Sequence, residues 1–212
     1  MLELTDLQQD ALTELFNISV GQAASVMSKM VNEEVTLSVP AVRFMNGTEA
    51  ADIFDNIGNQ RVSSVCQRFS GTFSGEALLI FPEDSSLEIV RLMIGKTIPL
   101  AQLTELEQDA LTEVGNIILN ACLCSLSDFF AQHFDTGMPC LRIGSGADVI
   151  GEEHRNEPVL FLHVRFTLAE RSVEGYVAFL MNLPSLHDLR AGIDHFLAEL
   201  NGGASGHETG LE

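Results

Sequence analysis

The chain has 212 residues, of which 30 are acidic and 11 are basic, giving a net charge of −19 at pH 7. This charge repels nucleic-acid phosphates and anionic lipid headgroups, so neither is expected as a partner. No uninterrupted apolar run approaches the roughly 18 residues that span a bilayer, and the N-terminus lacks a basic segment followed by an apolar one. We therefore expect a globular, cytoplasmic protein that binds neither nucleic acid nor membrane.

Cysteine and histidine spacing gives no support for a metal site. The four cysteines (Cys66, Cys122, Cys124 and Cys140) form no C-x-x-C pair, and the six histidines show no H-E-x-x-H spacing. The simplest interpretation is that the cysteines are small buried side chains in a reducing compartment.

The sequence contains an internal repeat. The segment Leu4 to Ile18 recurs at Leu103 to Ile117, an offset of 99 residues, with 11 of 15 positions identical. The correspondence continues further along the chain, with one small slip, through these pairs: Pro40 and Pro139, Arg43 and Arg142, Gly75 and Gly175. Two copies of about 100 residues are too few and too long for a solenoid, so a tandem duplication is predicted.

Each unit is predicted to begin and end with a helix and to hold strands between them. The long first helices cover about Thr5 to Met30 and Thr104 to Phe134, with Thr at the N-cap. The closing helices cover about Asp84 to Gly95 and Pro184 to Leu200. Alternating segments rich in Val, Phe, Ile and Leu predict strands at residues 34–44, 61–69, 76–81, 138–144, 158–168 and 175–182.

Helices that bracket runs of strands favour an α+β fold with a largely antiparallel sheet. The simplest arrangement is a pseudo-two-fold duplication in which both repeats share one sheet flanked by the long helices. We expect a single domain over residues 1–201, made of repeats at about 4–99 and 103–200, followed by a flexible tail at 202–212.

The repeated helix separates into two faces on a helical wheel. With Asp10 at zero and 100° per residue, Glu14 lies at about 40°, Asn17 at about −20° and Gly21 at about 20°. The second helix carries Asp109, Glu113, Asn116 and Asn120 at the same places. Five apolar side chains are expected to form the opposite, buried side of the first helix: Leu7, Leu12, Leu15, Phe16 and Ile18.

Two interpretations of the polar stripe remain open. A solvated helix face is the ordinary one, and the equally unchanged Ala11, Leu12 and Thr13 indicate that packing or recent duplication explains part of the identity. Against it, neighbouring surface positions differ between the units, whereas Asp, Glu and Asn do not. Like charges at i and i+4 also disfavour a helix, as does an internal Asn. The stripe therefore suggests a contact outside the helix.

Glu and Asn together suit the positioning of a water molecule. An amide side chain does not titrate but offers an acceptor and two donors, and a nearby carboxylate can hold a cation. Positioning and charge neutralisation carry most of phosphoryl-bond hydrolysis. The stripe holds no Lys, Arg or metal cluster, so a substrate would have to supply its own metal and cation.

The pattern Asp-x3-Glu-x2-Asn-x22-Pro resembles the signature of the CheC/CheX/FliY phosphatases of bacterial and archaeal chemotaxis, and two copies are similar to the CheC type. It occurs as Asp10, Glu14, Asn17 and Pro40, and again as Asp109, Glu113, Asn116 and Pro139. The resemblance implies an aspartyl-phosphate phosphatase acting on a phosphorylated CheY-like receiver domain, which brings the Mg²⁺ and an active-site lysine, with no cofactor bound by this chain.

The resemblance also implies a role for each motif residue. Asn17 and Asn116 would orient the attacking water, while Glu14 and Glu113 would contact the receiver's lysine. Asp10 and Asp109 would flank the contact, and Pro40 and Pro139 would fix the start of the strand beside each helix. Both sites are expected to be active, without a ranking. Gly115 would let another surface approach the second helix closely, whereas Gly21 would leave a gap on the first.

The resemblance further implies the deamidase CheD as a partner, although no CheD surface is identifiable in the sequence. One alternative is a non-catalytic adaptor or flagellar-switch-like module that binds CheY-phosphate. The short segments outside the repeats favour the free enzyme over this alternative. A phosphatase for another receiver domain is the other alternative.

Overall fold

The computed structural model describes residues 4–57, 61–83, 85–86, 89–90, 103–168 and 171–203. In chain order the elements are α1 (Asp6–Val31), β1 (Val35–Asn46), α2 (Gly47–Ile57), β2 (Val62–Ser70), β3 (Gly75–Pro82), α4 (Leu103–Phe129), β4 (Asp135–Thr136), β5 (Cys140–Gly144), α5 (Gly146–Ile150), the 3-10 turn η2 (Glu152–His154), β6 (Pro158–Leu168), β7 (Arg171–Met181) and α6 (Leu183–Gly203).

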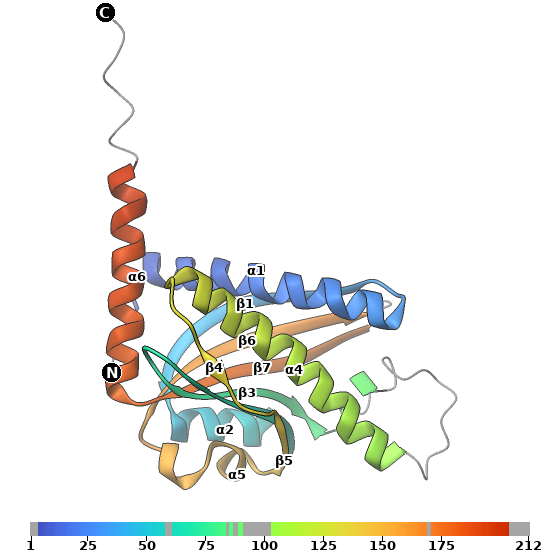
Figure 1. The fold of residues 1–212 in the computed structure, drawn as a ribbon. Helices are drawn as coiled ribbons and strands as arrows, with labels where there is room; N and C mark the ends of the chain where they lie inside the picture. Colours follow the sequence, from blue (N-terminus) through green and yellow to red (C-terminus); the bar gives the residue numbers. More distant parts are fainter. Residues whose placement is uncertain are drawn as a thin grey trace, which may run out of the picture.

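All strands belong to one antiparallel sheet (Figure 1). The order is β1-β6-β7-β3-β2-β4, and β5 also pairs with β2. The edge strand of each half therefore pairs with the other half: β1 lies on β6, and β5 lies on β2. From one edge the order is β1-β6-β7, and from the other edge it is β5-β2-β3, so each strand of one half stands where its counterpart from the other half stands. The central pair is β7 and β3. The predicted α+β class with a shared antiparallel sheet is confirmed.

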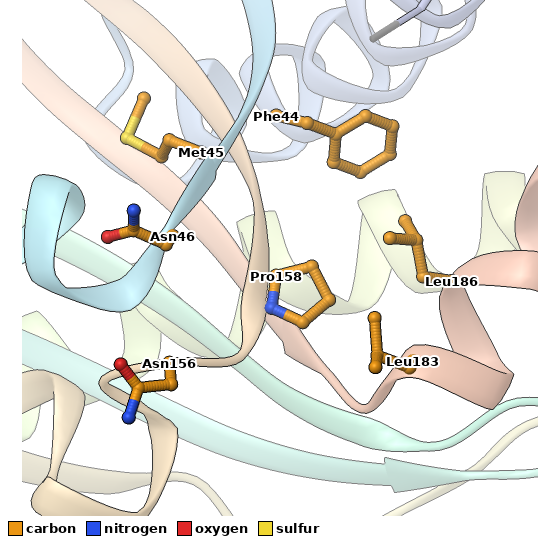
Figure 2. A pocket seen from close by; sticks show the side chains of 7 residues that line it. All are labelled: Phe44, Met45, Asn46, Asn156, Pro158, Leu183 and Leu186. Atoms are coloured by element: carbon orange, nitrogen blue, oxygen red, sulfur yellow. The ribbon is translucent and has the colours of Figure 1, made fainter. Parts of the chain in front are cut away.

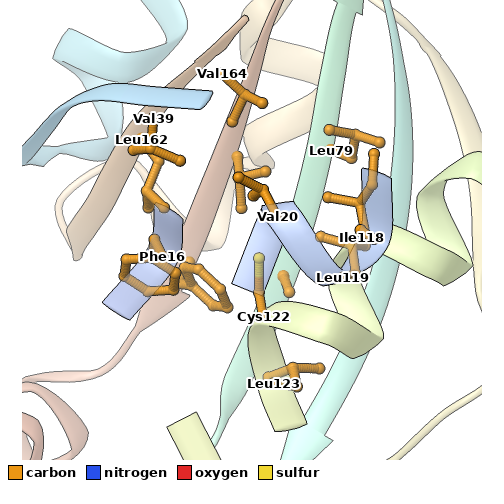
Figure 3. Close-up of a cluster of buried hydrophobic side chains, with 14 of the residues drawn as sticks. Phe16, Val20, Val39, Leu79, Ile118, Leu119, Cys122, Leu123, Leu162 and Val164 are labelled. Atoms are coloured by element: carbon orange, nitrogen blue, oxygen red, sulfur yellow. The ribbon is translucent and has the colours of Figure 1, made fainter. Parts of the chain in front are cut away.

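The helices lie on both faces of the sheet. Figure 1 shows α1 and α4 over one face and the shorter α2 and α5 over the other. The larger core lies under α1 and α4, where strand alternation points one set of side chains at the helices. Figure 3 shows part of this core, contributed by both long helices and the sheet: Phe16, Val20, Val39, Leu79, Ile118, Leu119, Cys122, Leu123, Leu162 and Val164.

Helix α1 has the predicted boundaries within one residue. Thr5 is the N-cap, and its hydroxyl accepts from the backbone N–H of Gln8 while the Gln8 side chain accepts from the Thr5 N–H. This reciprocal capping box satisfies two free donors at the helix start. The helix ends at Asn32, whose left-handed φ of 54° is tolerated by Asn.

Helix α4 ends at Phe129, so the predicted end near Phe134 is wrong. Ala131 has a left-handed φ of 48°, and the backbone N–H of Gln132 closes the turn onto the carbonyl of Ser127. The chain then turns Phe134 into the core, where its ring packs edge-on against Phe69 and Phe73. Burial of this aromatic ring explains why the helix stops early.

Among the described helices, α4 is long and apolar enough to cross a membrane by length and composition alone, over Leu106–Phe129. A core helix has the same composition, and Leu111, Val114 and Leu119 of α4 are buried in this structure.

The closing helices were predicted in part. Helix α6 matches the second and continues to Gly203, past the predicted start of the tail. Most of the first closing helix, with Gly95, lies outside the described residues, as do residues 204–212. The sequence interpretation missed α2 and α5, which cover the second face of the sheet.

The cysteines divide into two classes, so the prediction that all four are buried is wrong. Cys66 and Cys122 are buried, and burial raises the pKa of both thiols to about 12. Cys124 and Cys140 are exposed.

Candidate functional site

The carboxylates of the α1 motif (Asp10, Glu14, Asn17 and Pro40) face solvent. Asp10 and Glu14 are exposed on α1, and neither forms an ion pair or hydrogen bond with any described residue. The one basic residue that α1 carries, Lys29, lies in its last turn. This part of the helix surface is therefore an uncompensated negative patch that suits a cation from a binding partner.

Asn17 is half-buried and hydrogen-bonded to the adjacent strand. Its Nδ2 donates to the carbonyl of Val39 at 3.2 Å and to the carbonyl of Thr13 at 3.0 Å. Its Oδ1 accepts from the Val39 N–H at 2.8 Å. The amide thus serves both backbone groups of Val39.

A bulge in β1 explains why Val39 needs these bonds. The ladder shifts between Ser38 and Ala41, which pair with Arg165 and His163, so Val39 and Pro40 stand opposite one residue of β6. Pro40 has no N–H to donate, and a bulge leaves backbone groups unpaired. Pro40 therefore lies inside β1, at its bulge, and not at the start of the strand.

Other side chains of α1 bond to β1 in the same way. Gln9 Nε2 donates to the carbonyl of Val42, and Ser28 Oγ accepts from the Val35 N–H. Asn17 lies between these two contacts along the helix. Asn17 therefore has a structural role, because it joins α1 to β1. This role explains in part why the first repeat has an Asn at this position.

The α4 motif (Asp109, Glu113, Asn116 and Pro139) has the same exposed carboxylates but a different amide environment. Asp109 and Glu113 are exposed and bond to no described residue, and Asn116 is half-buried. Asn116 Oδ1 accepts from Asn120 Nδ2 at 2.7 Å. The Asn116 NH2 group donates to none of the residues described, so it is available to a ligand.

The strand segment beside α4 also differs. Met138 occupies the position that corresponds to Val39, yet its side chain is 90% exposed while Val39 is 1% exposed. Pro139 immediately precedes β5, at the start of the strand as expected. No hydrogen bond joins Asn116 to this segment among the described residues, so the strand does not cover the second amide.

The two glycines near the motifs have unequal surroundings. A Cβ added to Gly21 would meet nothing within 4 Å, which agrees with the expected gap on α1. A Cβ on Gly115 would lie 2.4 Å from the Val65 side chain of β2. Gly115 therefore lets another surface approach the second helix closely, and in this structure that surface is β2 of the chain itself.

Leu7 and Ile18 are 55% and 53% exposed, so their predicted place in the core is wrong. On the wheel they lie at about 60° and 80°, next to Glu14 and not opposite it. Leu12 and Phe16 are buried as predicted, and Leu15 packs partly against the core. The α1 motif thus has an apolar border on one side.

The site has no metal centre of its own among the described residues, where no group of three His, Cys, Asp or Glu side chains could hold an ion. It also lies away from the cavity of about 270 Å³ at the start of α6. Figure 2 shows the side chains that line this cavity, none of which belongs to a motif: Phe44, Met45, Asn46, Asn156, Pro158, Leu183 and Leu186. The carboxylates of the motifs thus lie on the exposed surface, outside this cavity.

Sequence reasoning missed two residues that act on the motif amides, Val39 and Gln67. Gln67 of β2 is 2% exposed and donates from Nε2 to Asn120 Oδ1 at 3.2 Å. A polar residue inside a strand of core residues was the available signal, but its partner lies 53 positions away in sequence.

Comparison with known sequences gives a consistent result. Residues 7–43 match the sequence model of the CheC-like family, a range that includes the α1 motif and none of the α4 motif. The CheY-P phosphatase CheC of Bacillus subtilis (strain 168) is 28% identical over 150 residues, covering 68% of this chain and 70% of that protein. The flagellar motor switch phosphatase FliY of the same organism is 24% identical over 168 residues, covering 78% of this chain but 43% of FliY.

Solved structures share the fold. FliY of Thermotoga maritima superposes with a TM-score of 0.73 at 17% identity, covering 91% of this chain and 98% of that one. CheX of Desulfovibrio desulfuricans gives a TM-score of 0.54 at 19% identity, covering 81% and 99%. The architecture is that of the CheC fold. The sequence matches agree with this fold, because the chain is similar to the CheC-like family over residues 7–43 and to CheC and FliY over longer segments.

Proposed function

We propose that this chain hydrolyses the aspartyl phosphate of a phosphorylated CheY-like receiver domain. Asn116 orients the attacking water at the α4 motif, and Glu113 contacts the receiver's active-site lysine. Asn17 and Glu14 take the same roles at the α1 motif. The observation that carries the proposal is the duplicated surface itself, in a chain similar to a CheY-P phosphatase. Each copy has two exposed carboxylates, which bond to none of the described residues, and one amide beside them.

The chemistry of the surface fits half of a hydrolytic site. The water oxygen bonds to phosphorus as the bond from phosphorus to the aspartyl oxygen breaks, which releases inorganic phosphate and restores the aspartate. The receiver supplies the Mg²⁺ and the lysine that neutralise the phosphoryl oxygens. This chain supplies position, which is what an amide that does not titrate can provide.

One observation favours a second function at α1. The Asn17 amide is already bonded to Val39 and Thr13, so it must leave three hydrogen bonds before it can hold a water. The α1 surface in its present state would bind a receiver without accelerating hydrolysis, as an adaptor would. On this second proposal, hydrolysis belongs mainly to α4.

A test uses a Mg²⁺-loaded receiver phosphorylated by a small-molecule phosphodonor, with the decay of its aspartyl phosphate as the readout. The wild-type chain should accelerate decay, and the Asn17→Ala/Asn116→Ala double variant should not. The matched control is Asn56→Ala, the same substitution on an exposed Asn of α2, on the other face of the sheet. Binding of a beryllofluoride-activated receiver without acceleration by the wild-type chain would support the adaptor and overturn the enzyme.

A further inference from the structure

Three amide side chains lie in a hydrogen-bonded row beneath the α4 motif. Gln67 Nε2 donates to Asn120 Oδ1 at 3.2 Å, and Asn120 Nδ2 donates to Asn116 Oδ1 at 2.7 Å. Gln67 is buried on β2, while Asn120 and Asn116 are half-buried on α4, one turn apart. We call these three residues the amide row.

A backbone carbonyl sets the direction of the amide row. Gln67 Nε2 also donates to the carbonyl of Gly137 at 3.2 Å, and a carbonyl can only accept. Gln67 must therefore turn its NH2 group, and not its oxygen, toward both Gly137 and Asn120. Asn120 then meets this donor with its oxygen and turns its own NH2 group to Asn116.

The consequence is a fixed orientation of the Asn116 amide. Its oxygen faces inward to Asn120, and its NH2 group faces away from the row. An isolated amide could turn over at little cost, because its two ends are similar in shape. Here, if the Asn116 amide turned over, its NH2 group would face the NH2 group of Asn120. If Asn120 turned over as well, its NH2 group would face that of Gln67.

The amide row lowers the stability of the fold, and the α1 motif has no such row. Gln67 Oε1 is buried without a hydrogen-bond partner among the described residues, which is unfavourable. Gln67 pairs with Ala77, and in the other half the core face of β6 carries Leu162 and Val164, which are ordinary core side chains. The α1 counterpart of Asn120 is Gly21, which cannot form the row.

We propose that Asn120, held by Gln67, is a positioning residue that fixes the amide of Asn116 for its work on the receiver's phosphoryl group. This inference rests on the proposed function. It predicts that breaking the row lowers kcat at the α4 motif while KM changes little, because Glu113 and the exposed surface that binds the receiver remain in place.

The test uses the full chain with Glu14→Arg, which removes receiver binding at α1. In this background Asn120→Ala, which favours the helix, and Gln67→Leu, which introduces a core side chain such as Leu162, should each lower kcat by about tenfold or more. KM should stay within about twofold, and the thermal midpoint of Gln67→Leu should equal or exceed that of its parent, because the unsatisfied oxygen is gone. The side-chain NH2 resonance of Asn116, assigned by its loss in Asn116→Ala, should shift in both variants.

The outcomes separate this inference from the proposed function. If Asn116→Ala abolishes acceleration in the Glu14→Arg background while Asn120→Ala and Gln67→Leu keep full kcat, the positioning role is overturned and the phosphatase remains. If Asn116→Ala itself keeps full kcat, both are overturned. A lower thermal midpoint with unchanged kcat in Gln67→Leu would indicate a structural amide row and would also overturn the inference.

Discussion

The two copies of the motif place the same side chains in unlike surroundings. On α1 the Asn17 amide completes the hydrogen bonding of a bulged strand. On α4 the Asn116 amide accepts from Asn120, and its NH2 group donates to none of the residues that the structure describes. The carboxylates do not differ, because all four are exposed. Identical residues in the two repeats therefore need not have the same hydrogen bonds. The strand next to each helix determines which bonds the Asn amide forms.

The largest expected effect is on the rate of dephosphorylation. Asn116→Ala should lower the total rate by about tenfold or more, because loss of a well-positioned group costs about 10²-fold at its own site. Asn17→Ala should lower it less than about twofold, because its amide is engaged. Steady-state phosphate release with each single variant measures both. Equal losses would show that the hydrogen bonds of Asn17 do not restrain it.

The next effect is on stability, where the α1 variant should lose more than the α4 variant. Asn17→Ala leaves the N–H and C=O of the buried Val39 without partners, so the free energy of unfolding should fall by about 1–3 kcal/mol. Asn116→Ala removes no bond to a buried backbone group and should change it by less than about 0.5 kcal/mol. Urea unfolding followed by circular dichroism gives both values. A larger loss for Asn116→Ala would reverse the comparison.

Alanine at the two glycines should change stability in opposite directions. Gly115→Ala places a Cβ 2.4 Å from Val65, and overpacking of this kind costs about 1–3 kcal/mol. Gly21→Ala meets nothing within 4 Å and should raise stability by up to about 1 kcal/mol, because Ala favours a helix. Thermal unfolding of the two variants compares them. If both were destabilising, the gap over Gly21 would not exist.

The smallest effect concerns the apolar border of the motif. Ile18→Ser should change the free energy of unfolding by less than about 0.5 kcal/mol, since this side chain is 53% exposed. The matched Ile117→Ser should cost about 1 kcal/mol, because Ile117 packs partly against the core. The same urea titrations measure both, and equal costs would contradict the burial difference.

Sequence periodicity was sufficient for the fold class and for the stripe, because both depend on local repetition. It failed for Leu7 and Ile18, which were assigned to the wrong side of the wheel, and for α2, where Asn46 and Glu49 form a short capping signal that was overlooked. Periodicity could not predict the surroundings of the amides. Asn17 meets Val39 through a bulge 22 residues away, and Asn120 meets Gln67 53 residues away. Neither separation follows a helical or strand period.

The exchange of edge strands makes the two halves inseparable. The edge strand of each half pairs with a strand of the other half. A chain cut between the repeats would therefore leave β6 without β1 and β2 without β5. Unfolding should then be one cooperative event across both repeats, with slow folding because these contacts join distant parts of the chain. The same connectivity describes how two identical ancestral chains would have paired as a two-fold dimer before fusion. The two motif surfaces would then have been related by symmetry before they were joined by a peptide bond.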